Sequence, residues 1–300
     1  MRGRLDHVLA ACFPELSRRA AKDAVARGRV FVDGRRCRVA SRDISPGARL
    51  RWFDDSAADA SSRDHGLRAP EFPILFQDED VLVLDKPPGV SVNESETAAA
   101  PSVVDRQRWV APHLVHRLDR DTSGVLVLAR HLGAARALSS AFAERRTRKV
   151  YWALVTGRPV EGVETAAIGR DPRRPRARRI RPDGRPAETR LSPLGTLGDL
   201  SWVEARPITG RTHQIRIHLA HRRAPVFGDL LYGGVDRARV AGEVVVAPRT
   251  ALHARALEVL VDGEVRRWEA PFPADLRALA PFDWDRPFEW DGGETGLGLA

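Results

Sequence analysis

The stretch HRLDRDTSGVLVLA, residues 116–129, places a dense group of charges directly before an apolar run. One histidine, two arginines and two aspartates take five of its first six positions, and the run Val125–Ala129 follows a Ser-Gly pair. A short apolar run after a turn signal is typical of a buried strand. Burying charged side chains beside a strand costs free energy unless they are paired with opposite charges or have a functional role. The stretch therefore predicts a fold built on a sheet, with a candidate functional loop where one strand begins.

Asp119 is the candidate reactive group of this loop, and its residue type leaves several roles open. A carboxylate can act as a base, a nucleophile or a metal ligand, and Asp121 two residues later would allow a cation site. The neighbouring arginines Arg117, Arg120 and Arg130 argue against a divalent cation. A carboxylate beside arginines is suited to a role as nucleophile or base.

Two further segments carry polar side chains within apolar patterns. GRTHQIRIHLAH, residues 210–221, reads as a helix in which Arg216 lies between two isoleucines, so part of its stem should be covered. A half-buried arginine needs a carboxylate partner. In KVYWALV, residues 149–155, Tyr151 takes an alternating strand position, which ordinary core packing would explain as well as a functional role would.

The net charge of +9 over 300 residues is concentrated near the N-terminus. Residues 1–53 hold thirteen Arg and Lys against five Asp and Glu, which is a balance of +8. A small domain with nearly all of the net charge predicts a polyanionic partner such as nucleic acid. The chain has no 18-residue apolar span and no apolar signal-peptide core, and Cys12 and Cys37 fit no metal-ligand spacing. We therefore expect a cytoplasmic, metal-free protein with no membrane partner.

The basic N-terminal segment reads as two helices followed by a hairpin. The patterns predict a helix over residues 4–12 and a second helix that Ser17 caps and that ends at Gly28. VFVDGRRCRV then predicts a hairpin with Asp33-Gly34 as its turn, and SPGARLRW predicts another turn and strand. The segment is thus a compact basic module.

This module resembles the alpha-L RNA-binding domain, the type named after ribosomal small-subunit protein S-four. The resemblance rests on RLDHVL, SRRAAKDAVARGRVFVDGRRC and SPGARL, within residues 1–53. It implies a small α/β RNA-binding domain in which Arg18, Arg19 and Lys22 face structured RNA. A solvated basic helix is the alternative interpretation of the same three side chains.

Composition divides the rest of the chain into a linker, a large domain and a tail. The small polar residues 54–70 read as a linker, and residues 282–300 read as an acidic tail. Between them, residues 71–281 hold strand patterns such as KVYWALVTG and LSWVEARPI, with helical patterns at 131–146 and in THQIRIHLAHR. Strands outnumber helices, so we expect an α+β domain built on a sheet.

The large domain resembles the RluA-type pseudouridine synthases, in the group that carries an alpha-L domain in front. Six motifs occur in the family's order: ILFQDEDVLVLDKPPGV, HRLDRDTSGVLVLAR, RKVYWALVTG, GRPAETR, ITGRTHQIRIHLAH and GDLLYGG. The resemblance implies an α+β catalytic domain with a mixed, mainly antiparallel sheet. It implies that Asp119 is the catalytic aspartate, Tyr151 the active-site tyrosine and Arg216 the basic partner of the aspartate. It also implies that Arg117 takes the place of a base extruded from RNA.

The implied reaction is the isomerisation of uridine to pseudouridine, in which uracil is detached from ribose, turned and reattached through C5. No redox change occurs, so no cofactor is implied. The target base must first leave its stack. The sequence leaves open whether Asp119 attacks the anomeric carbon, attacks the uracil ring or removes a sugar proton.

The expected partner is structured RNA, with large-subunit (23S) ribosomal RNA favoured over transfer RNA. A non-catalytic ribosome-assembly factor is the alternative from another class, whereas a DNA-binding protein is disfavoured because no segment resembles a major-groove recognition helix. Residues 93–112 depart from the family pattern, and residues 170–190 hold nine arginines amid Pro and Gly. We expect the latter to be a loop, either an RNA-binding flap or a solvated insertion. The expected oligomeric state is a monomer.

Overall fold

The computed structural model describes residues 3–13, 16–26, 30–32, 35–37, 39–48, 50–52, 72–92, 113–159, 161–175 and 177–279. The chain divides into two compact units, Met1–Arg68 and Ala69–Ala300. The expected linker, the Asp33-Gly34 turn, the unusual segment 93–112 and the acidic tail lie outside the described residues. Within the described ranges no helix is both long and apolar enough to cross a membrane.

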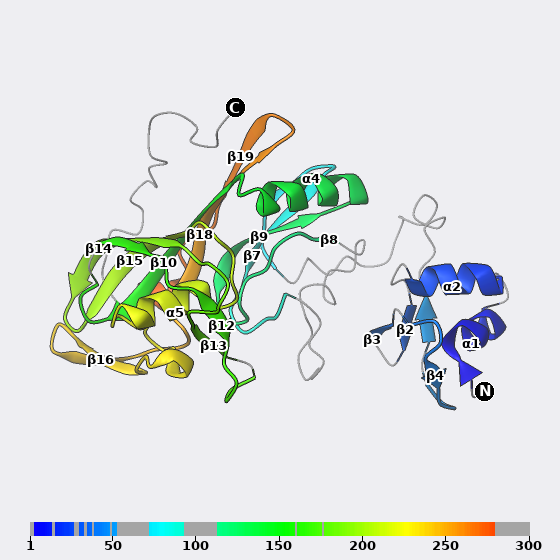
Figure 1. Ribbon diagram of the computed structural model, residues 1–300, viewed down its shortest axis with the longest axis horizontal. Helices are drawn as coiled ribbons and strands as arrows, with labels where there is room; N and C mark the ends of the chain where they lie inside the picture. The colour runs from blue at the N-terminus through cyan, green and yellow to red at the C-terminus, as the bar shows by residue number, and fades with distance from the viewer. Residues whose placement is uncertain are drawn as a thin grey trace. The chain divides into compact units, whose positions relative to one another are not determined.

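The N-terminal unit contains two helices and short antiparallel strands (Figure 1). Its elements are β1 (Gly3–Arg4), α1 (Leu5–Cys12), α2 (Arg18–Ala26), β2 (Val30–Val32), β3 (Arg35–Cys37), β4 (Asp43–Ile44) and β5 (Leu50–Trp52). β2 pairs with β3 and β5, and β1 pairs with β4. Ser17 Oγ accepts a hydrogen bond from the Ala20 N–H at 3.1 Å, as expected of a helix cap. The two predicted helices and the strand pairing of the hairpin are confirmed.

The second unit is an α+β domain, as predicted. Its strands are β6 (Ile74–Gln77), β7 (Val81–Lys86), β8 (His113–Leu114), β9 (Ser123–Ala129), β10 (Thr147–Thr156), β11 (Gly162–Glu164), β12 (Ile168–Arg170), β13 (Arg178–Ile180), β14 (Thr189–Leu197), β15 (Leu200–Pro207), β16 (Arg237–Val240), β17 (Glu243–Val246), β18 (Leu252–Val261) and β19 (Glu264–Glu269). Its helices are α4 (Leu132–Ala143), α5 (Gln214–His221), the 3-10 turn η2 (Leu230–Tyr232) and α6 (Ala274–Arg277).

A ten-stranded sheet runs through the described part of this unit in the order β11-β14-β15-β10-β18-β9-β7-β6, with β19 beside β18 and β8 beside β9. Its pairs are antiparallel except β18 and β9, which run parallel at Ser123 and Gly124. Gly124 has a φ of +109°, and a Cβ there would overlap the carbonyl oxygen of Ala254. Only glycine allows this close approach of the two strands. The parallel junction therefore lies directly after the charged loop of residues 116–122.

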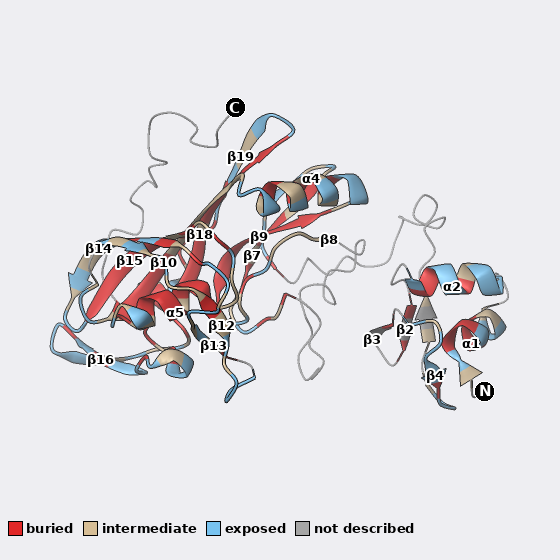
Figure 2. Cartoon of the chain, viewed as in Figure 1, coloured by how far each residue is buried: buried red, intermediate tan, exposed pale blue. Residues whose placement is uncertain are grey.

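Strand β9 is buried on both faces, as its continuous apolar run predicts (Figure 2). Val125 and Val127 pack in the core that α4 covers, whereas Leu126 and Leu128 pack on the opposite face with Leu118. Helix α5 packs against β14 and β15. The charged loop is thus held between two cores.

The prediction of a loop over residues 170–190 is wrong in part. Arg178–Ile180 pairs with Ile168–Arg170 in the hairpin β12–β13, and β14 already begins at Thr189. Ile168 and Ala187 are buried in a small cluster with Ile217 of α5. This packing against a distant helix stabilises a hairpin that the Pro-rich, Gly-rich sequence by itself does not favour.

Candidate active site

The loop of residues 115–122 is fastened to the sheet by His116. The His116 Nε2 accepts a hydrogen bond from the Val127 N–H of β9 at 2.9 Å, and its ring stacks on Phe142 with centroids 4.7 Å apart. Burial lowers the pKa of His116 to about 3, so the ring is neutral and can accept this bond. His116 therefore has a structural role in placing Asp119.

Lys86 fixes the backbone next to the aspartate. Its side chain is fully buried, and its Nζ donates to the carbonyl oxygens of Pro87 at 2.8 Å, Val90 at 2.9 Å and Arg120 at 3.0 Å. These three bonds use every N–H of the ammonium group. Burial lowers the pKa of Lys86 to about 7. The bond to Arg120 joins the end of β7 to the residue that follows Asp119.

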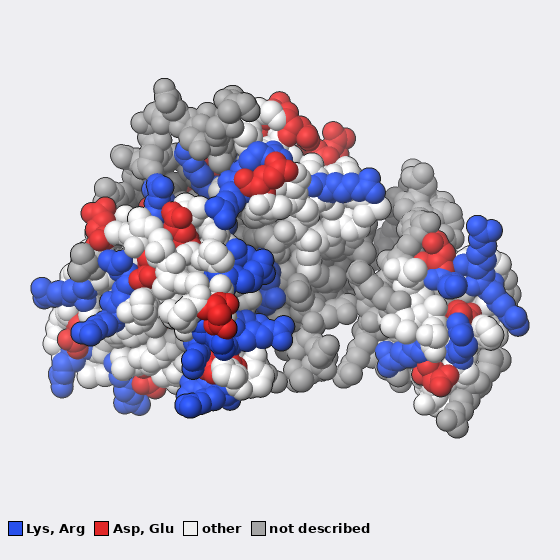
Figure 3. Space-filling model, viewed as in Figure 1, with Lys and Arg blue, Asp and Glu red and all other residues white. Residues whose placement is uncertain are grey.

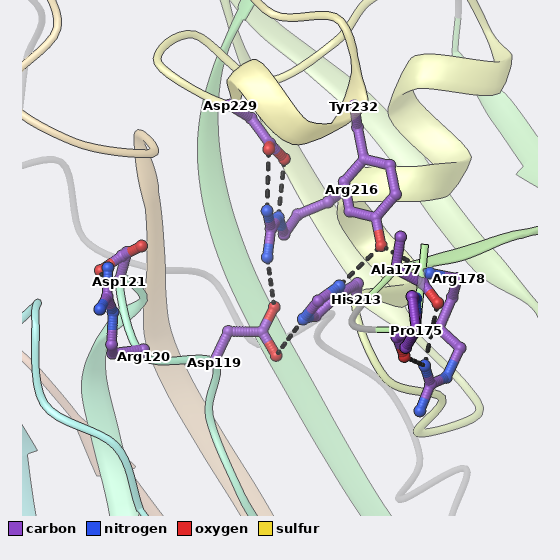
Figure 4. Close-up of polar contacts among 10 residues, drawn as sticks. All are labelled: Asp119, Arg120, Asp121, Pro175, Ala177, Arg178, His213, Arg216, Asp229 and Tyr232. Carbon is purple, nitrogen blue, oxygen red and sulfur yellow. Dashed lines mark hydrogen bonds and ion pairs between the residues drawn. The ribbon is translucent and has the colours of Figure 1, made fainter. Parts of the chain in front are cut away.

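Arg216 of α5 joins two carboxylates (Figure 4). Its Nη1 lies 3.3 Å from Asp119 Oδ2, and its Nε and Nη2 donate to Asp229 at 2.6 and 2.8 Å. Burial lowers the pKa of Arg216, but the bonds to Asp229 and the charges of Asp229 and Asp119 outweigh burial and raise it above the ordinary value. The neighbouring Ile215 and Ile217 are buried, so the expectation of a covered stem and a carboxylate partner is confirmed.

Tyr151 enters the site from β10, between β15 and β18. Burial raises the pKa of its phenol, and the charge of Asp119 raises it further. The hydroxyl is therefore protonated at neutral pH and can donate a hydrogen bond, while the ring offers an apolar face.

Asp119, Tyr151 and Arg216 line one cavity of about 670 Å³. The cavity lies entirely within the second unit, and Arg117 and His213 are also in its walls. This volume falls within the usual range for sites that bind small organic groups. The structure thus brings together the three predicted catalytic residues and Arg117.

Other charges of the opening motif point elsewhere. Asp121 pairs with Arg120 at 3.2 Å and lies away from Asp119, so the two aspartates do not form a shared cation site (Figure 4). Arg130 donates to the carbonyl oxygen of Asp78 at the far end of β9. The expectation that Arg130 lies around the aspartate pair is therefore wrong, because seven strand residues separate it from the loop.

In the N-terminal unit, Arg18, Arg19 and Lys22 are exposed on α2. Ala24 and Val25 of the same helix are buried in the core of that unit. The three basic side chains are therefore free to meet a ligand, and their contact with RNA stays a prediction.

Sequence reasoning gave no role to Asp229, Tyr232 or the contact of His213 with the aspartate. His213 Nε2 lies 3.9 Å from Asp119 Oδ1, and His213 Nδ1 lies 2.7 Å from the Tyr232 hydroxyl. The available signal was the GDLLYGG motif, whose aspartate is the carboxylate that Arg216 needs. The motif does not reveal this pairing, because thirteen residues separate Arg216 from Asp229.

Comparisons with known proteins identify the family. Residues 80–221 match the family described as RNA pseudouridylate synthase, and residues 3–50 match the S4 domain. Ribosomal large subunit pseudouridine synthase D of Xanthomonas campestris is 37% identical over 296 residues, which cover 92% of this chain and 87% of that protein. An RNA pseudouridine synthase of Chloroflexus aurantiacus, itself uncharacterized, is 40% identical over 290 residues, covering 92% and 88%.

A solved structure agrees with the sequence matches. Human RNA pseudouridylate synthase domain containing 1 has a TM-score of 0.58 and 30% identity, and the similarity covers 72% of this chain and 89% of that chain. The resemblance expected from the sequence motifs is confirmed for both units. The chain therefore belongs to the RluA-type RNA pseudouridine synthase family, and it is an isomerase.

Proposed function

We propose that this protein isomerises uridine to pseudouridine in large-subunit ribosomal RNA, with Asp119 as the catalytic carboxylate. One observation carries the proposal: Asp119 faces a cavity of about 670 Å³ while it is paired with Arg216, and Tyr151 lines the same cavity. The class of RNA is supported by relatives named ribosomal large subunit pseudouridine synthase D, which are up to 37% identical.

The proposed chemistry is balanced without an oxidant or a reductant. The bond from uracil N1 to ribose C1′ breaks, the base turns, and a bond from C5 to C1′ forms. The hydrogen on C5 leaves as a proton and N1 gains a proton, so the composition of the RNA is unchanged. A carboxylate such as Asp119 can serve as the nucleophile or base of this sequence.

Arg216 and Tyr151 would assist Asp119 in different ways. Arg216 holds one carboxylate oxygen, so the aspartate keeps a single orientation toward the cavity. Tyr151 offers its ring to the uracil and a protonated hydroxyl for a hydrogen bond, because burial raises the pKa of the phenol.

A basic wall of the cavity supports RNA as the substrate. The wall consists of Arg145, Lys149, Arg185 and Arg211. Within the described part of the chain, none of these four side chains forms an ion pair with a carboxylate. Burial and, to a smaller extent, the charge of Arg145 lower the pKa of Lys149 to about 8. Unpaired cations that repel one another are suited to phosphate groups.

Arg117 is the residue that we propose to take the place of the extruded base. Its side chain is exposed, and it lines the same cavity as Asp119. Removing a base from its stack costs a few kcal/mol. An arginine that fills the gap in the stack would offset part of this cost.

The experiment that tests the proposal measures tritium release from RNA labelled at uridine C5, because the rearrangement expels that hydrogen. Ribosomal RNA and transfer RNA are offered separately to the wild type and to Asp119→Asn, which keeps the shape of the side chain and removes its charge. Release from ribosomal RNA by the wild type alone is the expected result.

The other outcomes are equally informative. Release from transfer RNA only would replace the proposed substrate class. Substantial release by Asp119→Asn would remove Asp119 from the catalytic role. Binding of RNA without any release, from free RNA or from assembling ribosomal particles, would favour a non-catalytic assembly factor.

We also propose that the chain acts as a cytoplasmic monomer without a metal or cofactor. The proposal that no metal or cofactor is needed has chemical support, since the rearrangement is redox-neutral and needs only acid–base and nucleophilic groups. Size-exclusion chromatography tests the monomer, and activity retained after treatment with a chelator tests the absence of a metal requirement.

A further inference from the structure

Tyr232, in the GDLLYGG motif, touches three groups around Asp119 (Figure 4). Its hydroxyl oxygen lies 2.7 Å from His213 Nδ1 and accepts a hydrogen bond from the Arg178 N–H at 3.0 Å. The Arg216 Cζ lies over the Tyr232 ring, 5.0 Å from the ring centroid. Tyr232 lies beyond residues 80–221, which match the synthase family.

The two groups that Tyr232 contacts approach different oxygens of the aspartate. Arg216 Nη1 lies 3.3 Å from Asp119 Oδ2, whereas His213 Nε2 lies 3.9 Å from Asp119 Oδ1. The second distance exceeds a hydrogen bond, and catalytic hydrogen bonds are often long before substrate binds. The side chains that approach the two oxygens of Asp119, Arg216 and His213, therefore both contact Tyr232.

The backbone of His213 adopts an uncommon conformation. His213 directly precedes α5 and has a φ of 58°, in the left-handed region that residues other than glycine rarely adopt. Such a conformation is strained and persists where the surroundings determine it. The T-shaped contact of the His213 and Tyr232 rings, with centroids 5.6 Å apart, is part of those surroundings.

Hydrogen-bond donors and acceptors around Tyr232 favour one imidazole tautomer of His213. The Tyr232 oxygen already accepts the Arg178 N–H, and the acceptor within reach of its own proton is His213 Nδ1. In a neutral imidazole, an Nδ1 that accepts a bond leaves the proton on Nε2. The Nε2–H then points at the Asp119 carboxylate as a donor.

The neutral state of the ring is consistent with its surroundings. Burial lowers the pKa of His213 by more than the Asp119 carboxylate raises it. Arg216 and Arg178 lower the pKa further, and Asp229 raises it. These groups come from the charged loop, from α5, from β13 and from the turn that contains GDLLYGG, which are the elements facing the ring.

We propose that His213 and Tyr232 are positioning residues of the isomerase, in which the Tyr232 hydroxyl fixes His213 as the Nε2–H tautomer and this N–H orients Asp119. The inference rests on the proposed catalytic role of Asp119. Because the Arg178 N–H donates to the Tyr232 hydroxyl, the arginine-rich hairpin β12–β13 is joined to the catalytic aspartate through two hydrogen bonds and the 3.9 Å contact of His213 with Asp119.

Exposed arginines gather on this hairpin and its turn, including Arg170, Arg173, Arg174 and Arg179 (Figure 3). Among the described residues of this segment, Arg181 pairs with Asp183, whereas the guanidinium groups of those four arginines form no ion pair with a carboxylate. An RNA backbone that docks on the hairpin would therefore act on a segment that is bonded to Tyr232.

Three variants test the proposal. Tyr232→Phe removes the hydroxyl and keeps the ring under Arg216. His213→Asn keeps a residue that tolerates a positive φ and places a polar group near the Nδ1 position, but it removes the donor that faces Asp119. His213→Gln restores a donor at about the position of Nε2.

The expected results separate positioning from folding and from binding. Under single-turnover conditions, Tyr232→Phe and His213→Asn should release tritium about 10- to 100-fold more slowly, because a misplaced reactive group costs rate rather than affinity. Their RNA dissociation constants and unfolding midpoints should stay close to those of the wild type. His213→Gln should recover part of the rate. The double variant Tyr232→Phe/His213→Asn should be no slower than His213→Asn, because both changes remove the same connection from the Tyr232 hydroxyl through His213 to Asp119.

A spectroscopic measurement tests the tautomer directly. In ¹⁵N spectra of histidine-labelled protein, with the His213 signals assigned from His213→Asn, the wild type should carry its proton on Nε2. Tyr232→Phe should show both tautomers. A proton on Nδ1 in the wild type would overturn the assignment.

The remaining outcomes are decisive as well. Wild-type rates in folded Tyr232→Phe and His213→Asn would overturn the positioning role, and so would rate losses that merely follow losses of RNA affinity or of stability. A wild type without activity on any RNA would instead contradict the proposed function, which keeps the two failures distinct.

Discussion

Asp229 holds Arg216 through both of its carboxylate oxygens, and replacing it by asparagine tests how far the site depends on this clamp. The Asp229 side chain is 1% exposed and that of Arg216 is 12% exposed, so the pair is almost fully removed from water. Asparagine has nearly the same shape, but its amide can accept only one of the two bonds, and its NH₂ faces a guanidinium N–H.

The magnitude follows from what Asp229→Asn leaves behind. Breaking a buried ion pair costs about 3–5 kcal/mol when the remaining charge has no partner. Arg216 retains Asp119 at 3.3 Å, so its charge stays partly compensated. We therefore expect a loss of about 2–3 kcal/mol in the free energy of unfolding, close to the contribution of one hydrogen bond to a charged group. Without the clamp Arg216 can shift Asp119, and we expect tritium release to slow about 10- to 100-fold.

Urea unfolding and single-turnover tritium release measure the two effects on the same protein. Asp183→Asn is the matched control, because Asp183 makes the same two-bond contact with Arg181 at 2.6 Å on each arm but on the solvated hairpin. Exposed ion pairs contribute little to stability, so this variant should unfold and react like the wild type. A folded Asp229→Asn with the wild-type rate, or equal losses in both variants, would show that the site does not depend on the clamp between Asp229 and Arg216.

Three further changes test the framework of the site and the basic module. Gly124→Ala should lower the free energy of unfolding by about 2–4 kcal/mol, because its Cβ would overlap the Ala254 carbonyl at a positive φ; an unchanged thermal midpoint would contradict the close approach of β9 and β18. Lys86→Met should leave three carbonyls without a donor and slow the reaction. The pKa of Lys86 is about 7 in the folded protein and higher in the unfolded chain, so between pH 7 and about 10 only the unfolded chain keeps this proton. Raising the pH through this range should therefore raise the free energy of unfolding of the wild type, relative to Lys86→Met, by about 1 kcal/mol per pH unit. If the free energies of unfolding of the two proteins changed with pH in parallel, this titration of Lys86 would be excluded. Replacing Arg18, Arg19 and Lys22 together by alanine should make the slope of log affinity against log salt shallower by about one for each phosphate that these side chains neutralise, and an equal slope would mean that α2 does not bind RNA.

Local sequence patterns predicted the framework of the catalytic unit because the physics behind them is local. The run Val125–Ala129 is buried as β9, and the Ile215–Ile217 segment covers the stem of Arg216. The strand at Tyr151 and the helix before it were also predicted from periodicity. Each of these predictions needs only the side-chain period of one element.

The predicted loop over residues 170–190 and the expected place of Arg130 were wrong because position along the chain does not decide which residues are neighbours in the folded protein. The hairpin β12–β13 lies where a loop was predicted, because Ile168 and Ala187 pack on Ile217 and the Tyr232 hydroxyl binds its backbone. Arg130 is a neighbour of the aspartates in sequence but lies at the other end of an extended strand. Proximity along the chain is a poor guide to proximity across a strand.

Residue patterns alone indicated which element carries Asp119, that Arg216 needs a carboxylate partner, and that most of the net charge lies in a separate basic module. The folded structure was needed to show that this carboxylate is Asp229 as well as Asp119, and that Tyr232 contacts His213 beside the aspartate. Asp119 and Arg216 are 97 residues apart, and their meeting depends on strand order and on the parallel β9–β18 junction. Local propensity does not encode such contacts, because many registers and packings satisfy the same local pattern and only the assembled core selects one of them.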